Sequence, residues 1–461
     1  MSEIICAIST PSGMGAIAVI RLSGAGAIAL VDTIFRGAKN KKLIHQPAYS
    51  VHFGKIMRDE HTLDEVLVTL FHAPHSFTGE ESVEIACHGS PFIQQQLIQL
   101  LIEKGARLAK AGEFTRRAFR NGKMDLSQAE AVADLIASTS RAAHRVAMNQ
   151  MRGGFADALS KLREQLLRFV SLIELELDFS EEDVEFVDRS RLVDLVNKID
   201  AEISSLVESF SVGNAIKNGI PVAIIGETNV GKSTLLNYIL NEEKAIVSDI
   251  HGTTRDTIED TVQIGGVLFR FIDTAGIRHT TDMVESLGIE RTFQKIDQSS
   301  IVLWIIDLTK TVDEIEATAH HILPKLHDKQ VILLFNKSDL LSCAELQEKN
   351  SLLTLIDAER LFVSIKQRQN MEQLYPLLQK AAHIPEIGQS DIIVSNLRHF
   401  EALKKAQDAI HRVQEGLTNT ISNDFLSQDI RECLFHIGEI TGHISTDEIL
   451  GNIFRNFCIG K

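Results

Sequence analysis

Cysteine is scarce in this sequence of 461 residues, and its few copies are scattered. The five cysteines are Cys6, Cys87, Cys343, Cys433 and Cys458. An odd number without paired spacing argues against a disulfide framework and against a zinc-ribbon site. The pattern is typical of a reducing compartment, so we expect a cytoplasmic protein.

Long apolar runs, a basic leader and an excess of positive charge are also missing. No stretch approaches the ~18 consecutive apolar residues that a membrane-spanning helix needs. The start, MSEIICAISTPSG, has no basic residues before an apolar stretch, so we predict no signal peptide and no membrane anchor. The formal net charge is −15, which disfavours broad, non-specific binding to nucleic acid but leaves room for a local basic patch.

Three regions of different texture follow one another along the chain. Residues 1–118 mix short apolar runs with Gly and Pro, which is typical of a small α+β domain. Residues 119–213 and 381–461 carry apolar stripes at helical spacing. Residues 214–380 alternate buried strands with helices, so we predict an α/β domain inserted into a discontinuous helical domain. The polar stretch SVGNAIKNG (211–219) is predicted as the break before the insertion.

Buried strands in the inserted region predict where its ligand binds. They are PVAII (221–225), VLFRFID (267–273), IVLWIID (301–307) and VILLFN (331–336). Continuous apolar strands separated by helices predict a parallel sheet covered on both faces. Ligands bind such sheets at the carboxyl ends of the strands, so the motifs that follow these strands are expected to meet.

A phosphate-binding loop follows the first of these strands. GETNVGKS (226–233) precedes the apolar helix start TLLNYIL, and this strand–loop–helix context predicts a P-loop. Its glycines let backbone N–H groups point at phosphate oxygens. Lys232 is predicted to reach the β- and γ-phosphates, and Ser233 to bind Mg²⁺. The nucleotide-binding residues predicted here are Asn229, Val230, Gly231, Lys232, Ser233 and Thr234.

Further motifs indicate that the nucleotide is GTP. DTAG (273–276) ends a strand, where its Asp can reach the surroundings of the metal and Gly276 can contact the γ-phosphate. The carboxylate of Asp339, in NKSD (336–339), can accept two N–H donors from guanine, which adenine does not offer. SIK (364–366) can complete the base pocket. The residues assigned are Asp273, Thr274, Ala275, Gly276, Asn336, Lys337, Asp339, Ser364, Ile365 and Lys366. Together these motifs predict a Ras-like P-loop G domain.

A Gly-Thr-Thr stretch lies between the P-loop and DTAG, where a switch segment belongs. Thr254 is the candidate that closes over Mg²⁺; the alternative is a mobile surface loop. The nucleotide contacts predicted from this stretch are Ser248, Asp249, Ile250, His251, Gly252, Thr253 and Thr254.

The group that activates the hydrolytic water is not the usual one. Ile277 stands where Ras-like enzymes have a water-orienting Gln, and Glu285 is the candidate replacement. No arginine finger is evident, and a monovalent cation near the side-chain oxygen of Asn229 could replace its charge. Asn229 could equally be an ordinary turn residue.

At this point the chain resembles the tRNA-modification GTPase family MnmE, also called TrmE. The resemblance covers essentially the whole chain. Besides the G motifs it rests on STPSGMGAIAVIRLSG (9–24), SFTGEESVE (76–84), AGEFTRRAFRNGKMDLSQAEAVADLI (111–136) and FCIGK (457–461). Thr228 stands where the family usually has Pro, and Ser248 where Thr is common; neither departure changes the ligands expected.

The resemblance implies three parts: an N-terminal domain that binds folate and dimerises, a helical domain from both chain halves, and an inserted G domain. It implies K⁺-stimulated hydrolysis, with Asn229, Ser248, Ile250 and Thr253 as K⁺ ligands, Ser233 and Thr254 on Mg²⁺, and Glu285 on the water. It also implies a site for 5-formyl- or methylene-tetrahydrofolate. The folate residues carried over are Arg21, Glu84, Lys123 and Lys461, with Cys458 as a possible reactive thiol.

The partners implied are a second copy of the chain, an MnmG-like FAD protein that completes a heterotetramer, and tRNA. The reaction implied places an aminomethyl or carboxymethylaminomethyl group on C5 of the wobble uridine. An alternative from another class is a regulatory GTPase switch, for example in ribosome assembly, without folate chemistry.

Two features of the sequence, the basic segment 104–123 and Cys458, each allow two interpretations. Residues 104–123 hold seven basic groups against one acid, and form either a site for tRNA phosphate or a folate tail, or a solvated face with local ion pairs. Cys458 is either a nucleophile or a small apolar residue packed near a terminus.

Overall fold

The architecture comes from a computed structural model, in which the chain forms two compact units. The first comprises Met1–Ala137, Ala147–Ile203 and Glu401–Lys461; the second comprises Ser138–Val146 and Ser204–Phe400. The structure describes residues 3–37, 41–178, 189–243, 260–272, 293–342, 345–347, 349, 358–383, 388, 391–419, 421–444, 447–455, 457 and 460. Across these ranges, no helix combines the length and apolar character needed to cross a bilayer.

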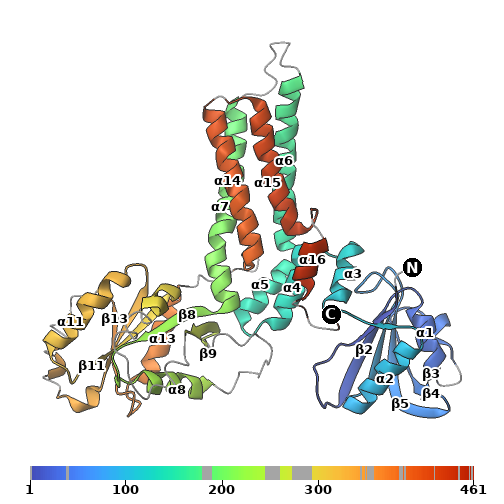
Figure 1. Cartoon of the computed structure of the whole chain (residues 1–461), viewed down its shortest axis with the longest axis horizontal. Coiled ribbons are helices and arrows are strands. Elements are labelled where there is room, and N and C mark those ends of the chain that lie inside the picture. The colour runs from blue at the N-terminus through green and yellow to red at the C-terminus, as the bar shows by residue number, and fades with distance from the viewer. Residues whose placement is uncertain are drawn as a thin grey trace. The chain divides into compact units, whose positions relative to one another are not determined.

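The N-terminal part of the first unit is a sheet covered on one face by two helices (Figure 1). Its strand order is β3-β4-β5-β6-β2-β1-β7, antiparallel except for the β1–β7 pair. Alternation along the strands sends Ile20, Val68 and Ile85 into the core under the helices. This confirms the predicted α+β character. The elements are β1 (Ile5–Ile8), β2 (Ile17–Ser23), α1 (Ala27–Ile34), β3 (Phe35–Gly37), β4 (Ser50–Arg58), β5 (His61–Phe71), β6 (Ser82–His88), α2 (Pro91–Glu103) and β7 (Arg107–Leu108).

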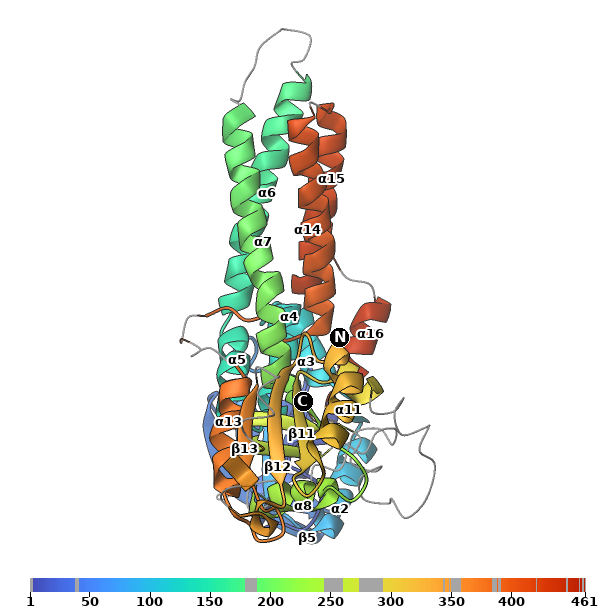
Figure 2. The ribbon, with the colours of Figure 1, turned by 90° about the vertical axis from the view of Figure 1, so that its left-hand side faces the viewer.

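The rest of the first unit is helical. Four long helices, α6 (Gly154–Asp178), α7 (Arg189–Asn218), α14 (Leu397–Thr418) and α15 (Asn423–Thr441), lie side by side (Figure 2). Ion pairs join the halves of the chain, because Arg431 on α15 contacts Glu174 on α6 and His411 on α14 lies 3.1 Å from Asp200 on α7. The shorter helices are α3 (Glu113–Arg120), α4 (Leu126–Ala137), α5 (Arg141–Met151) and α16 (Asp447–Arg455). The part of α5 up to Val146 and the part of α7 from Ser204 onward belong to the second unit.

The predicted break at 211–219 is wrong, because α7 continues to Asn218. The hydroxyl of Ser211, in this stretch, donates to the backbone carbonyl of Glu208, and that of Ser209, just before it, donates to the carbonyl of Leu206. Gly213 does not form a turn. A glycine is needed there because a Cβ would lie 2.1 Å from the carbonyl oxygen of Val394.

The second unit contains a six-stranded sheet in the order β13-β12-β11-β8-β10-β9. All neighbours are parallel except β9 and β10, so the expected parallel sheet is confirmed. One face packs on α8 and α13, and the other packs on α11. The elements are β8 (Ile220–Ile225), α8 (Lys232–Glu243), β9 (Asp260–Ile264), β10 (Val267–Phe271), β11 (Ile301–Asp307), α11 (Val312–Ile322), β12 (Gln330–Asn336), β13 (Glu359–Phe362) and α13 (Leu374–Ala381).

Candidate nucleotide-binding and N-terminal sites

The loop between β8 and α8 has the curled backbone that phosphate binding requires. Gly226 (φ +145°), Asn229 (φ +61°) and Gly231 (φ +109°) all have positive φ. A Cβ on Gly226 would lie 2.5 Å from the carbonyl oxygen of Ile305, so only glycine fits there. Ser233 and Thr234 are exposed in the first turn of α8, where a hydroxyl can reach a metal ion beside a phosphate.

Lys232 is folded back over this loop. Its Nζ donates to the carbonyl oxygen of Gly226 at 2.7 Å and also to that of Glu227. Burial lowers the pKa of Lys232, and Lys295 adds to this effect, while Glu227 opposes it. The ammonium thus lies at the centre of the loop curl, in reach of a phosphate that enters it.

Asn336 connects three segments that are distant in the sequence. It is buried at the end of β12, where its Nδ2 donates to the carbonyl oxygen of Val230 at 2.7 Å. Its Oδ1 accepts from the backbone N–H of Ile365 at 3.0 Å. The P-loop, NKSD and SIK motifs therefore meet, as the parallel sheet predicts. The sequence predicts Asn336 as a nucleotide contact, and nothing in the motif indicates this bridging role.

The neighbours of Asn336 leave an accessible edge for a base. Asp339 and Lys366 are exposed, while Ser364 is buried. Lys337 pairs with Asp307 at the end of β11. Burial alone would raise the pKa of Asp307, but hydrogen bonds from Lys337 and Thr309 outweigh it and lower that pKa.

Glu227, in the P-loop, is anchored by contacts that the sequence does not predict. Its carboxylate pairs with Lys310 and accepts from the hydroxyl of Thr318 at 3.0 Å. These contacts tie the P-loop to α11. No motif signals them, because the partners are more than 80 residues away in the sequence.

Several predicted site residues lie outside the described residues and stay predictions. They are Ser248, Asp249, Ile250, His251, Gly252, Thr253, Thr254, Asp273, Thr274, Ala275, Gly276, Glu285, Cys458 and Lys461.

In the first unit, Arg21 and Glu84 lie opposite each other on β2 and β6. The guanidinium donates to Glu84 Oε1 from Nη2 at 2.7 Å and from Nε at 3.0 Å. It also lies 5.6 Å from the ring centroid of Phe77 and 5.9 Å from that of Phe114. Both rings belong to the SFTGEESVE and AGEFTRRAF segments, but their role was not foreseen. The result is a partly buried ion pair beside aromatic rings.

The loop that carries Phe77 also contacts Lys123. The Nζ of Lys123 donates to the carbonyl oxygen of Pro74 at 3.1 Å. The chain end approaches β1, because the hydroxyl of Ser9 donates to the carbonyl oxygen of Gly460 at 3.2 Å. Gly460 has φ +98°, and a Cβ there would lie 2.4 Å from the carbonyl oxygen of Ile8.

Comparisons with known proteins cover the whole chain. The family model described as GTP-binding protein TrmE N-terminus matches residues 4–123, and the one described as MnmE helical domain matches residues 126–458. The protein named tRNA modification GTPase MnmE from Bacteroides thetaiotaomicron is 60% identical over 100% of this chain and 99% of its own length. The protein of that name from Flavobacterium johnsoniae is 54% identical over 99% of each chain.

Likeness to solved structures is partial. The crystal structure of Era in complex with MgGDPNP and nucleotides 1506–1542 of 16S ribosomal RNA is 28% identical, over 41% of this chain and 66% of that chain, with a TM-score of 0.26.

Proposed function

The chain belongs to the tRNA modification GTPase MnmE family, and we propose that it is a K⁺-activated GTP hydrolase that takes part in modifying the wobble uridine of tRNA. The observation that carries the GTPase part is the junction at Asn336. A curled P-loop, the end of β12 and the Ile365 backbone are held together by one buried side chain. Asp339 is exposed at the same edge, where its carboxylate can select guanine.

The residues around the P-loop support this chemistry. Lys232 is placed to bind the β- and γ-phosphates once it leaves the carbonyls of Gly226 and Glu227. The exposed hydroxyl of Ser233, with Thr254, would hold Mg²⁺, which neutralises charge that develops on the phosphates. Asn229 is exposed and would hold K⁺ with Ser248, Ile250 and Thr253, and Glu285 would orient the attacking water.

The K⁺ part has a direct test. GTP turnover should be faster in K⁺ than in Na⁺ at equal ionic strength, because the ion stands in for an arginine finger. Equal rates in the two salts would remove Asn229 from the cation site.

Folate is proposed as the source of the one-carbon unit. Arg21, Glu84, Lys123 and Lys461 would bind 5-formyl- or methylene-tetrahydrofolate. The partly buried Arg21–Glu84 pair beside the rings of Phe77 and Phe114 suits a planar heterocycle that carries hydrogen-bonding groups.

A homodimer is proposed through the open face of the N-terminal sheet. Phe53 on β4 and Leu67 on β5 are register partners on this face, and Phe53 is 58% exposed. Val51 on the same face is equally exposed. Apolar side chains in one patch favour burial against a second copy. An MnmG-like FAD protein would complete a heterotetramer in the cytoplasm, with tRNA as the substrate of the complex.

Analysis of wobble nucleosides in tRNA from cells that lack the protein tests this function most directly. The proposal expects the C5-substituted uridines to disappear and unmodified uridine to take their place. Unchanged nucleosides would contradict it.

Titration with 5-formyl-tetrahydrofolate separates this proposal from a regulatory switch. The purified chain should bind it saturably, and Arg21→Ala should weaken binding about 10-fold or more because the ion-paired guanidinium is lost. An exposed arginine on α14, replaced in Arg412→Ala, is the matched control. A ribosome-assembly switch would show no saturable binding to either variant or to the parent.

A further inference from the structure

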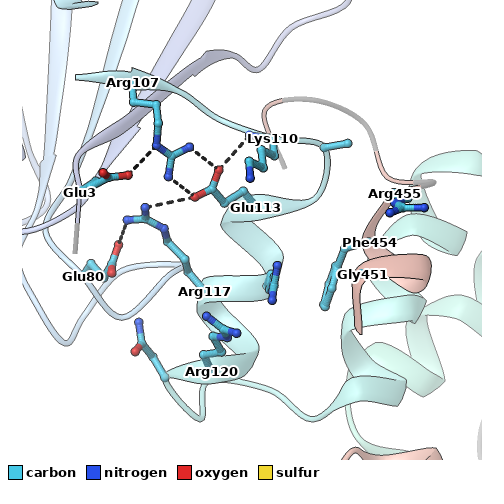
Figure 3. A pocket seen from close by; sticks show the side chains of 13 residues that line it. Glu3, Glu80, Arg107, Lys110, Glu113, Arg117, Arg120, Gly451, Phe454 and Arg455 are labelled. Carbon is cyan, nitrogen blue, oxygen red and sulfur yellow. Dashed lines mark hydrogen bonds and ion pairs between the residues drawn. The ribbon is translucent and has the colours of Figure 1, made fainter. Parts of the chain in front are cut away.

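A cationic pocket in the first unit lies outside both sites described above. It encloses about 630 Å³, with the segment from β7 through α3 on one side and Gly451, Phe454 and Arg455 of α16 on the other (Figure 3). Six of its lining residues are basic and three, Glu3, Glu80 and Glu113, are acidic. The basic residues are Arg107, Lys110, Arg116, Arg117, Arg120 and Arg455.

Two of the arginines form ion pairs with the three carboxylates. Arg107 donates to Glu113 from two guanidinium nitrogens, at 2.7 and 2.9 Å, and to Glu3 at 2.7 Å. Arg117 bridges Glu80 at 2.9 Å and Glu113 at 3.2 Å (Figure 3). Burial alone would raise the pKa of Glu113, but the hydrogen bonds from Arg107 and from the Lys110 backbone outweigh it and lower that pKa to about 2. The carboxylate of Glu113 is therefore ionised at neutral pH, and each of the three carboxylates is paired with an arginine.

Two further basic side chains of the lining, Lys110 and Arg455, add positive charge to the pocket. Lys110 and Arg455 are exposed, and neither side chain forms an ion pair with any residue in the described part of the chain. Arg120, also exposed, comes from the last turn of α3. The residues thus come from three places: the loop before α3, α3 itself and α16. In a protein of net charge −15, such a pocket attracts an anion locally while the rest of the surface repels it.

The packing holds these groups in place. Gly112, at the start of α3, has φ +63°, and a Cβ there would lie 2.8 Å from the carbonyl oxygen of Phe454. Phe454 itself is buried against Leu126 and Ala129 of α4. The start of α3 and α16 are therefore in direct contact beside the pocket, so the charges they carry have a defined spacing.

The lining favours phosphates over a planar ligand. Phe454, the aromatic residue of the lining, is only 2% exposed, so the described lining offers no ring on which a base or a pterin could stack. Arginine guanidinium groups match phosphate oxygens in paired hydrogen bonds. Phosphate contacts of this kind position a nucleic acid without reading its sequence.

We propose that this pocket binds the phosphate backbone of RNA, with Lys110, Arg120 and Arg455 as contacts. The proposal rests on the proposed function in tRNA modification, and it adds a place on this chain where the tRNA is held. The basic segment 104–123 does not act as one patch, since Lys104 lines a different pocket together with Arg36 and Lys41.

The test compares two triple variants of the full chain. Lys110→Gln, Arg120→Gln and Arg455→Gln remove three charges from the pocket and leave the Arg107–Glu113–Arg117 network intact. Arg36→Gln, Lys41→Gln and Lys104→Gln remove three charges from the second cationic pocket of the same unit. Binding of a tRNA transcript with a wobble uridine is measured by fluorescence anisotropy at several salt concentrations, and 5-formyl-tetrahydrofolate binding is measured in parallel.

The pocket variant should bind tRNA about 10-fold or more weakly at ~0.1 M salt, with a slope of log K against log salt shallower by about 2. The control variant should bind tRNA with an affinity within about threefold of that of the parent.

Both variants should hydrolyse GTP at the parent rate and bind folate as the parent does. Equal losses in the two variants, no loss in either, or a parent that does not bind tRNA would overturn the proposal. A folate loss confined to the pocket variant would instead assign the pocket to a folate tail. None of these outcomes alters the wobble-nucleoside analysis, which tests the proposed function separately.

Discussion

The two sheets of this chain build their candidate sites in different ways. In the second unit, parallel strands end at a common edge, and short motifs that follow β8 and β12 meet there. In the first unit, antiparallel β2 and β6 place Arg21 and Glu84 opposite each other in the middle of a face. In the parallel sheet the site residues follow the ends of the strands. In the antiparallel sheet they lie within strands that are distant in the sequence. The residues of a site at the edge of a parallel sheet therefore appear in the sequence as short motifs. Those of a site on the face of an antiparallel sheet do not.

The largest effect is expected at the edge of the parallel sheet. Lys232→Ala should slow GTP hydrolysis by about 10²–10³-fold or more, because a charge next to the transferred phosphate is lost. Single-turnover hydrolysis measures the rate. Lys325→Ala, a lysine of the same unit outside the motifs, should stay within about twofold of the parent. A Lys232→Ala protein that turns over at the parent rate would contradict the site.

A second change addresses the water-activating group. Glu285→Ala should slow hydrolysis by about 10²-fold while GTP affinity changes little, because a carboxylate that acts on water contributes little to binding the ground state. Stopped-flow binding and steady-state turnover in K⁺ separate the two. Glu316→Ala, an acid on α11, is the control. Hydrolysis at the parent rate would remove Glu285 from the mechanism.

Asn336→Ala probes the junction itself. Its loss leaves the Val230 carbonyl and the Ile365 N–H without their buried partner, which costs about 1–3 kcal/mol of unfolding free energy. Urea unfolding of the full chain, followed by the fluorescence of Trp304 in β11, reports on this unit. The exposed Asn218→Ala should be nearly neutral. A stability like that of the parent would show that Asn336 does not hold the motifs together.

The smallest effect is expected in the first unit and depends on pH. Because the pKa of Glu113 falls from its ordinary 4.5 to about 2 on folding, its ionised form stabilises the fold above pH 4.5, and this contribution is lost as the pH falls towards 2. The melting temperature of Glu113→Gln should therefore lie below that of the parent at pH 7, and the gap should narrow between pH 4.5 and about 2. Exposed Glu60→Gln is the control. A gap that does not depend on pH would mean that the charge of Glu113 is not what stabilises α3.

The sequence predicts the G domain well because its signals are local. Strand, loop and helix are adjacent around Lys232, so one short segment carries the geometry. Its failures are contacts across long separations: Glu227 with Lys310, Arg21 with Phe114, and Arg117 with Glu80. The error at 211–219 has the same origin, since Gly213 meets Val394 and nothing local reveals that α7 needs a small residue there.

Competition between GTP and ATP for the purified full chain in Mg²⁺ tests the central claim most directly. GTP should bind about 10²-fold or more tightly, and Asp339→Asn should remove the preference because the carboxylate no longer accepts the two guanine N–H donors. A chain that prefers ATP, or that binds neither nucleotide, would contradict the account.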